Sequence, residues 1–310
     1  EGAVDGEEGV HASLMRAVVS ITHPPMSTGT DPTITSVGKS MRCFLPLLFF
    51  VFATYAVPQD GKQALIAHVK ALSAATTDAV RDSINPLIKQ ELRVLLNAPD
   101  GLAAPMDDIP LSRVDAPDGS FRLITWNLAR TDGSHQHEGF LLSKSGRGNA
   151  LTELRDKTSS LPSPEAVELG PDRWYGALYY HVIPVKKGGK TWYTLLGWKG
   201  YSKVETRKVI EVLSFRGGKP RFGAALFGAG RPRAMRKSYG YSFQTSMVLR
   251  WEPEMEAILM DHLSPSRADM VGQPAYYGPD MTHDAYFWYK GEWWLEPDID
   301  ARDLRPNGRT

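Results

Sequence analysis

Short runs of aromatic and β-branched residues, separated by glycine-containing turns, make up most of the sequence after Gly101. Runs of this kind are typical of β-strands, because such side chains pack well on a pleated surface. Glycine at 187–189, 216–218 and 290–291 supplies the positive φ of tight hairpin turns, so neighbouring strands should be antiparallel. The expected strands are residues 121–127, 137–142, 175–185, 191–198, 208–215, 241–251, 256–262, 285–289 and 292–295.

One of these runs, 175–185, is apolar on both faces, with Tyr179 and Ile183 on one side and Val182 on the other. A strand of this type is central and covered twice, here by the other strands and by helices at the N-terminus. The segment 144–171 is rich in Ser, Gly, Pro and charge, which predicts a loop with a short helix at 150–157.

Helical periodicity is confined to residues 61–97, where apolar side chains recur at steps of three and four. Asn85 followed by Pro86 has the form of an N-cap and a first helical residue, which predicts two helices in series separated at that point. The fold class is therefore α+β: two N-terminal helices followed by a mostly antiparallel β-sheet, sandwich or partly closed barrel. The β-rich region is expected at 118–300.

An export signal is expected at 41–56. Met41 and Arg42 precede an apolar run at 44–52, and the small residue Ala56 ends the segment, which is the pattern of a secretory signal peptide. Cleavage after Ala56 would leave a single mature domain, 57–310, in the periplasm or outside the cell. The run is shorter than the roughly 20 residues that span a bilayer, so no transmembrane segment is expected. We interpret 1–40 as a non-native or upstream-translated segment.

Composition excludes several classes of function. A formal net charge of +1 leaves no basic stripe of the kind that binds nucleic acid. The chain has one cysteine, Cys43, and it lies inside the expected signal. A disulfide framework, a thiolate zinc site and thiol catalysis are therefore excluded for 57–310, and we expect neither cofactor nor metal.

Three acidic or basic side chains are candidates for catalysis. Asp261 and His262 end an apolar run, where a strand would present an acid and a base to a cleft. Glu211 shares a strand face with Val209 and Leu213, so an inward carboxylate there would need a partner or a raised pKa. Paired with Asp261, it would form a glycosidase-like dyad. The alternatives are a turn-capping role for Asp261, a backbone-bonding His262 and a solvent-facing Glu211 on an edge strand.

Other polar groups fit weaker hypotheses. Ser246 or Ser264 could form a triad with His262, but the chain lacks a Gly-x-Ser-x-Gly elbow. Metal ligands could come from two sets, each with a local turn role as the alternative. These are His135 and His137 with His181 or His283, and Asp280, His283 and Asp284. The Arg-rich stretch 230–237 suits an anionic ligand or a solvated loop.

Aromatic residues are more numerous than a core of this size needs, with eight tryptophans and the adjacent pairs Tyr276-Tyr277 and Trp293-Trp294. Neighbours in a strand point to opposite faces, so at least one ring of the tryptophan pair should be exposed. Exposed rings suit a flat platform for a glycan or an envelope protein. The candidate binding residues are Trp198, Tyr276, Tyr277 and Trp293, and packing within a β core is the alternative.

The segments 118–127, 179–188, 191–198 and 277–286 together resemble a family of uncharacterised secreted proteins of Bacteroidetes-type bacteria. The resemblance extends over 64–302. It implies export and a single β-rich domain, and it implies no activity. The family tends to carry an acidic residue after the Gly197-Trp198 position, where this chain has Lys199.

The sequence thus supports three functions from different classes. The leading one is a non-enzymatic exported binding module that uses exposed aromatics. The second is a hydrolase that uses Asp261, His262 and Glu211. The third is an assembly partner, which would need an exposed apolar stripe on Leu65 and its helical neighbours Val69, Leu72 and Val80.

Overall fold

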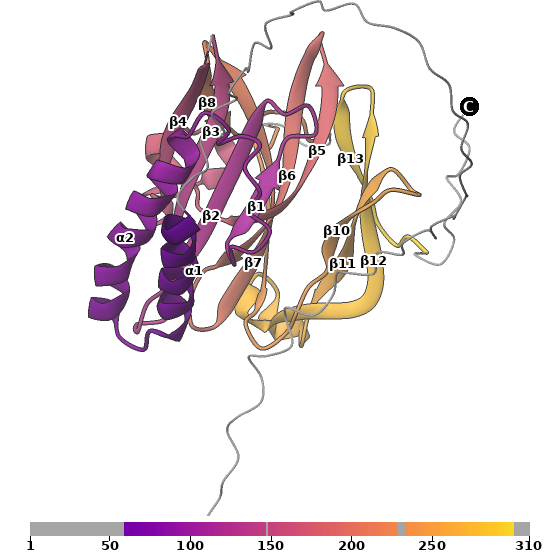
Figure 1. Ribbon diagram of the computed structural model, residues 1–310. Coiled ribbons are helices and arrows are strands. Elements are labelled where there is room, and N and C mark those ends of the chain that lie inside the picture. The colour runs from indigo at the N-terminus through magenta and orange to yellow at the C-terminus, as the bar shows by residue number, and fades with distance from the viewer. Residues whose placement is uncertain (1–58, 147, 229–232, 301–310) are drawn as a thin grey trace, which may run out of the picture. The chain divides into compact units, whose positions relative to one another are not determined.

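The computed structural model describes residues 59–146, 148–228 and 233–300 (Figure 1). All of them belong to one compact unit, Thr54–Thr310. The expected signal peptide at 41–56 and the segment 1–40 lie outside the described residues, so both remain predictions.

Two helices precede the strands, as predicted: α1 (Gln59–Ala74) and α2 (Asp78–Asn97). The predicted break at Asn85 is wrong, because Thr77 begins α2 and its hydroxyl accepts the N–H of Val80. Asn85 is buried instead, where its side chain accepts from Trp126 Nε1 at 2.8 Å. Pro86 lies inside α2, so the packing of the helix outweighs the local cost of proline.

Thirteen strands form three antiparallel sheets in the described residues, which confirms the α+β class with sandwich-like stacking. The first sheet contains β1 (Ser112–Asp115), β2 (Phe121–Ala129), β3 (His135–Ser145) and β4 (Gly148–Arg155). The second contains β5 (Leu178–Lys187), β6 (Lys190–Gly200), β7 (Glu205–Arg216) and β8 (Lys219–Phe222), with β9 (Lys237–Ser242) paired to β7. The third contains β10 (Leu249–Glu252), β11 (Ala257–Pro265), β12 (Tyr277–Tyr289) and β13 (Glu292–Glu296).

The three predicted glycine turns are confirmed, since they join β5 to β6, β7 to β8 and β12 to β13 as antiparallel neighbours. Short 3-10 helices occupy several of the other connections. They are Thr158–Ser160, Pro164–Ala166, Pro171–Arg173, Ala268–Met270 and Pro274–Tyr276.

The elements stack in four layers: the helices, then the first, second and third sheets (Figure 1). The helices pack on β2 and β3 through Leu65, Leu92, Trp126 and Phe140. The opposite face of the first sheet packs on the second sheet, and the other face of the second sheet packs on the third. This order of layers fixes which strand edges and sheet ends remain open.

Strand β7 is covered on both faces along its middle. Val209 and Leu213 face the first sheet, while Ile210 and Val212 face the third. The central position predicted for 175–185 is wrong, because β5 stands at the end of its sheet and pairs only with β6. The helices do not cover it either, since the first sheet lies between them.

Two other predicted elements are wrong. Residues 150–155 belong to β4 rather than to a helix, because they pair with β3 from Ala150 opposite Ser143 to Arg155 opposite Glu138. Residues 241–251 are two strands, β9 and β10, since the chain crosses there from the second sheet to the third. The strands β1 and β8 were not anticipated.

The helical face proposed for assembly is largely buried. Leu65, Val69 and Leu72 pack against the first sheet, and Val80 alone of that stripe is exposed. Of the helices in the described ranges, none has the length and apolar character needed to cross a membrane.

Candidate binding site

A pocket of about 530 Å³ lies where β9 and the segment after it meet the ends of β11 and β12. We call it the neutral pocket, because its lining, drawn from the described residues, contains no Asp, Glu, Lys, Arg or His. It is lined by Val204, Ser242, Phe243, Gln244, Thr245, Ser264, Ser266, Ala275, Tyr276, Tyr277, Gly278 and Pro279.

Two aromatic rings of the neutral pocket are open to solvent: Phe243 is 54% exposed and Tyr276 is 48% exposed. The adjacent Tyr277 is partly buried, and its hydroxyl accepts the N–H of Gly272 at 3.0 Å. The short helix Pro274–Tyr276 sits tightly on β9, because a Cβ at Gly240 would come 2.7 Å from Pro274. Glycine at 240 therefore allows the approach that places Tyr276 beside the pocket.

Neutral hydrogen-bonding groups stand among these rings. Ser242 Oγ accepts the N–H of Gln244, and the hydroxyl of Thr245 donates to the Ser242 carbonyl at 3.1 Å. The side-chain amide of Gln244 and the hydroxyl of Ser266 are not hydrogen-bonded to another described residue, whereas the backbone N–H of each residue is. The pocket therefore offers exposed rings beside donors and acceptors that carry no charge.

The structure separates the four predicted binding aromatics. Tyr276 and Tyr277 lie together in the neutral pocket. Trp198 is half-buried and lies edge-on to His135 at 6.0 Å, outside that lining. Trp293 is fully buried, and its Nε1 donates to Thr194 Oγ1 at 2.9 Å, so its expected exposure is wrong. The alternation of side chains along β13 exposes Trp294 instead.

The catalytic candidates Asp261 and His262 each form a separate local contact. The Asp261 carboxylate accepts the N–H of Val248 at 2.8 Å and lies 3.5 Å from His283 Nε2. His262 pairs with Asp284 at 2.9 Å, and this hydrogen bond raises the pKa of the imidazole. In the residues the structure describes, no hydrogen bond joins His262 to Asp261, Ser246 or Ser264, so neither an acid–base pair nor a triad is assembled.

Glu211 is fully buried on β7, so the solvent-facing interpretation is wrong. Its carboxylate accepts from Arg236 Nε at 3.0 Å, and both side chains are inaccessible to solvent. Burial raises the pKa of Glu211, while the Arg236 guanidinium acts in the opposite direction. In the described part of the chain, Glu211 contacts neither Asp261 nor His262, and the glycosidase-like dyad is not formed.

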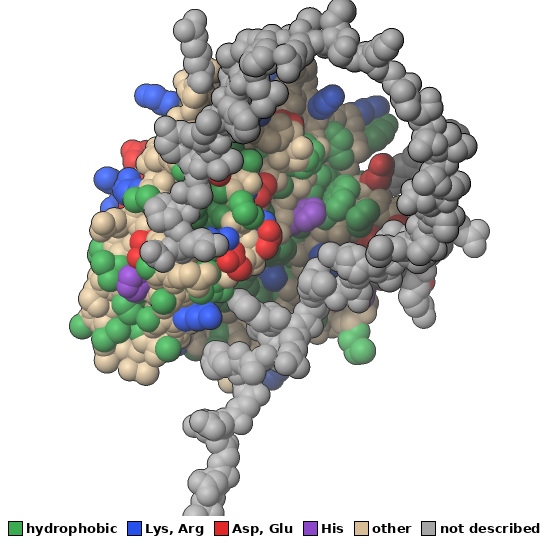
Figure 2. Space-filling view, viewed as in Figure 1, with side chains coloured by type: hydrophobic (Ala, Val, Ile, Leu, Met, Phe, Trp, Pro, Cys, Tyr) green, Lys and Arg blue, Asp and Glu red, His purple; other side chains and the backbone are tan. Residues whose placement is uncertain are grey.

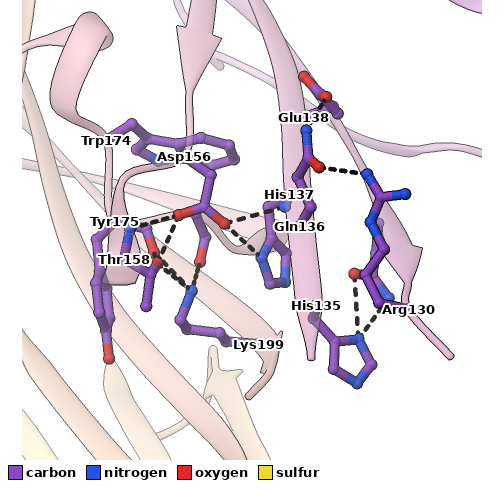
Figure 3. A network of polar contacts seen from close by, with 12 residues as sticks. Arg130, His135, Gln136, His137, Glu138, Asp156, Thr158, Trp174, Tyr175 and Lys199 are labelled. Carbon is purple, nitrogen blue, oxygen red and sulfur yellow. Dashed lines mark hydrogen bonds and ion pairs between the residues drawn. The ribbon is translucent and has the colours of Figure 1, made fainter. Parts of the chain in front are cut away.

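A buried polar network that sequence reasoning missed joins β3, the segment 156–158 that follows β4, β6 and residues 175–176 (Figure 3). Asp156 accepts from Thr158 Oγ1 at 2.5 Å and faces His137 Nδ1 at 3.0 Å. Lys199 Nζ donates to Thr158 Oγ1 at 2.8 Å and to the carbonyls of Tyr175 and Gly176 at 2.7 Å each. All three donors of the ammonium group are therefore used.

Electrostatics keep this network in one protonation state. Burial, followed by the charge of Lys199, lowers the pKa of His137 to about 4. Burial opposes ionisation of Asp156, but the hydrogen bond from His137 and the Lys199 charge outweigh it and lower that pKa to about 2. Burial also lowers the pKa of Lys199 to about 8. At neutral pH the imidazole is neutral, with its proton on Nδ1 toward Asp156, and its Nε2 has no hydrogen-bond partner among the described residues.

The network has little contact with solvent, since His137 and Lys199 are buried and the side chain of Asp156 is 5% exposed. We assign it a structural role. The visible signal in the sequence was Lys199 itself, a charge that directly follows an apolar run of β6.

The two sets of metal ligands that were weighed as weaker hypotheses are not assembled among the described residues. Across 59–146, 148–228 and 233–300, no group of three or more His, Cys, Asp or Glu side chains is arranged to hold a metal ion. His137 is committed to Asp156, and His135 Nδ1 lies within hydrogen-bond distance of Asn127. Asp280 has the local role proposed as the alternative, because it accepts the N–H and hydroxyl of Thr282.

The Arg-rich stretch lies partly outside the described residues. The described arginines in it are both paired, Arg233 with Glu292 and Arg236 with Glu211. No family model matches the chain, and neither curated proteins nor solved structures give a match. The resemblance to the secreted Bacteroidetes-type family therefore remains a prediction.

Proposed function

We propose that this protein is a non-enzymatic, exported binding module that takes an uncharged glycan in the neutral pocket. The observation that carries the proposal is the pairing of two half-exposed rings, Phe243 and Tyr276, with uncharged hydrogen-bonding groups in one cavity of about 530 Å³. Sugar rings present an apolar face and a rim of hydroxyls, which match exposed aromatics and neutral donors and acceptors, respectively. Export is proposed on the sequence pattern at 41–56 alone.

The roles within the pocket follow from chemistry. Tyr276 and Phe243 would stack on the apolar faces of the sugar, because a flat ring gives a large contact at little entropic cost. Gln244 and Ser266 would bond the sugar hydroxyls, since their side chains are not committed to other described residues. The absence of charge in the lining disfavours acidic sugars, because a carboxylate would lose hydration without gaining a cation.

A glycan array with the full chain, followed by calorimetry on the best ligand, tests the proposal. The Tyr276→Ala and Phe243→Ala variants should each bind about tenfold more weakly, because loss of about 1.5 kcal/mol of ring contact is a factor of roughly ten. The matched control is Tyr289→Ala, which removes a ring that is 47% exposed and lies outside the neutral pocket. Equal weakening by all three variants, or binding only of charged glycans, would contradict the proposal.

A further inference from the structure

A second cavity, of about 560 Å³, lies between the open edge of β5 and the third sheet. We call it the β5 groove. One wall is the strand edge 181–186, and the other contains Trp251, Trp288, Trp293 and Glu256. Figure 2 shows hydrophobic side chains gathered over the region where Figure 1 places β5 and β13.

The edge of β5 that faces this groove pairs with no other strand of the described residues. Lys187 and Lys190 close the two-residue hairpin between β5 and β6, so they form a hydrogen-bonded pair. By alternation, Ile183 and Val185 also pair with β6, while Val182, Pro184 and Lys186 direct their backbone groups outward. Pro184 fits this alternation. A proline has no N–H to donate to a neighbouring strand, so in a sheet it is found where its nitrogen faces an open edge.

The side chains on each face of β5 determine which residues an added strand should carry on the same face. Ile183 and Val185 point toward the third sheet and pack with the groove tryptophans. Residues opposite them on an added strand would therefore lie over Trp251 and Trp288, which are partly exposed. Large apolar side chains fit that side.

The charged residues of the groove favour different side chains on the two faces of the added strand. Lys186 is exposed and forms no ion pair with any described residue, so an acidic residue directly opposite it would gain a cross-strand partner. Glu256 stands on the third-sheet wall and disfavours a carboxylate there. The acidic residues therefore belong on the Lys186 side and the apolar residues on the tryptophan side.

We propose that the β5 groove binds an extended segment of a partner polypeptide, added as a strand to β5, in which acidic and large apolar residues alternate. Backbone hydrogen bonds to Val182 and Lys186 supply much of the affinity, and the tryptophan wall and Lys186 supply the specificity. This site is separate from the neutral pocket and does not depend on the proposed glycan binding.

The probe is a displayed library of random peptides of about nine residues, selected against the full chain, since such peptides can span the open edge. Enriched peptides should alternate acidic and apolar residues. Methylation of backbone nitrogens at every second position should abolish binding of the best peptide, whereas methylation at the intervening positions should not. That alternation is specific to a strand paired along one edge.

Variants of the protein complete the test. Lys186→Glu should weaken the best peptide about tenfold, because an attractive cross-strand pair becomes repulsive. Lys190→Glu is the matched control, since this exposed lysine of the same hairpin does not line the groove. Trp288→Leu should weaken binding while leaving thermal unfolding near that of the wild type. Tyr276→Ala should leave peptide binding unchanged, which separates this site from the glycan proposal.

Four results would overturn the inference. They are no enrichment of any peptide, equal binding to Lys186→Glu and Lys190→Glu, no alternation in the methylation scan, or self-association of the chain that Lys186→Glu abolishes. The last result would show that a second copy of the chain occupies the edge.

Discussion

Acidification should destabilise this protein through His137. Its imidazole is fully buried, and burial lowers its pKa to about 4, against about 6.5 in an unfolded chain. Because the folded pKa is the lower one, the unfolded chain takes up the proton first as the pH falls. The stabilisation is thus complete above about pH 6.5 and is lost as the pH approaches 4. At about 1.4 kcal/mol for each unit, the loss is about 3 kcal/mol.

The burial of His137 Nε2 is the physical cause of the low pKa. Protonation would add an N–H at a buried atom that has no acceptor among the residues the structure describes, close to the charge of Lys199. The matched variant is His137→Asn, whose amide can still donate to Asp156 but does not titrate.

Urea unfolding of both proteins between about pH 7 and pH 4 measures the effect. The difference in unfolding free energy between wild type and His137→Asn should change by about 3 kcal/mol across this range. Burial lowers the pKa of His135 and His181, while Asp284 raises that of His262. These contributions occur in both proteins and cancel in the difference. A constant difference, or an NMR titration of His137 near pH 6.5, would refute the reasoning.

Three further substitutions and one control probe the same architecture, each measured by urea unfolding. Gly176→Ala should cost about 3 kcal/mol, because its Cβ would come 2.5 Å from Asp156 Oδ2 at a φ of +64°. Gly188→Ala, at a φ of +59° in open space, should cost about 1 kcal/mol and serves as its control. Lys199→Met should cost about 3 kcal/mol at neutral pH, since two backbone carbonyls lose their donor. The wild type should also gain stability relative to this variant as the pH rises through about 8, because the folded lysine loses its proton first. Thr77→Ala should cost about 1 kcal/mol through loss of the helix cap, and an unchanged stability would contradict that assignment.

Hairpins could be predicted from sequence because their partners are adjacent in the chain and their glycine turns are local. The β4 strand could not, because its identity depends on pairing with β3 rather than on the spacing of Leu151 and Leu154, which imitates a helix turn. The break between α1 and α2 was misplaced for a similar reason. Asn85 resembles a cap, but its side chain bonds Trp126 on another layer.

The residues of the candidate site also differ in whether the sequence could predict them. Tyr276 and Tyr277 stood out because they are adjacent in the sequence, but Phe243 did not, since its place depends on how β9 pairs with β7 and contacts Pro274–Tyr276. Glu211 could be recognised as an unusual inward carboxylate. Its partner Arg236 could not, because the intervening chain has no periodicity that would place it.

The third sheet explains why two cavities occur where they do. It packs on the second sheet through the middle of its strands, where Ile258, Met260 and Tyr286 are buried. The neutral pocket lies at the end of this sheet where Pro265 pairs with Tyr277, and the β5 groove lies at the end where Ala257 pairs with Phe287. The boundary between the first and second sheets instead contains the compensated charges of the Lys199 network. Recognition is therefore expected at the two ends of the third sheet, and the buried network maintains the scaffold that presents them.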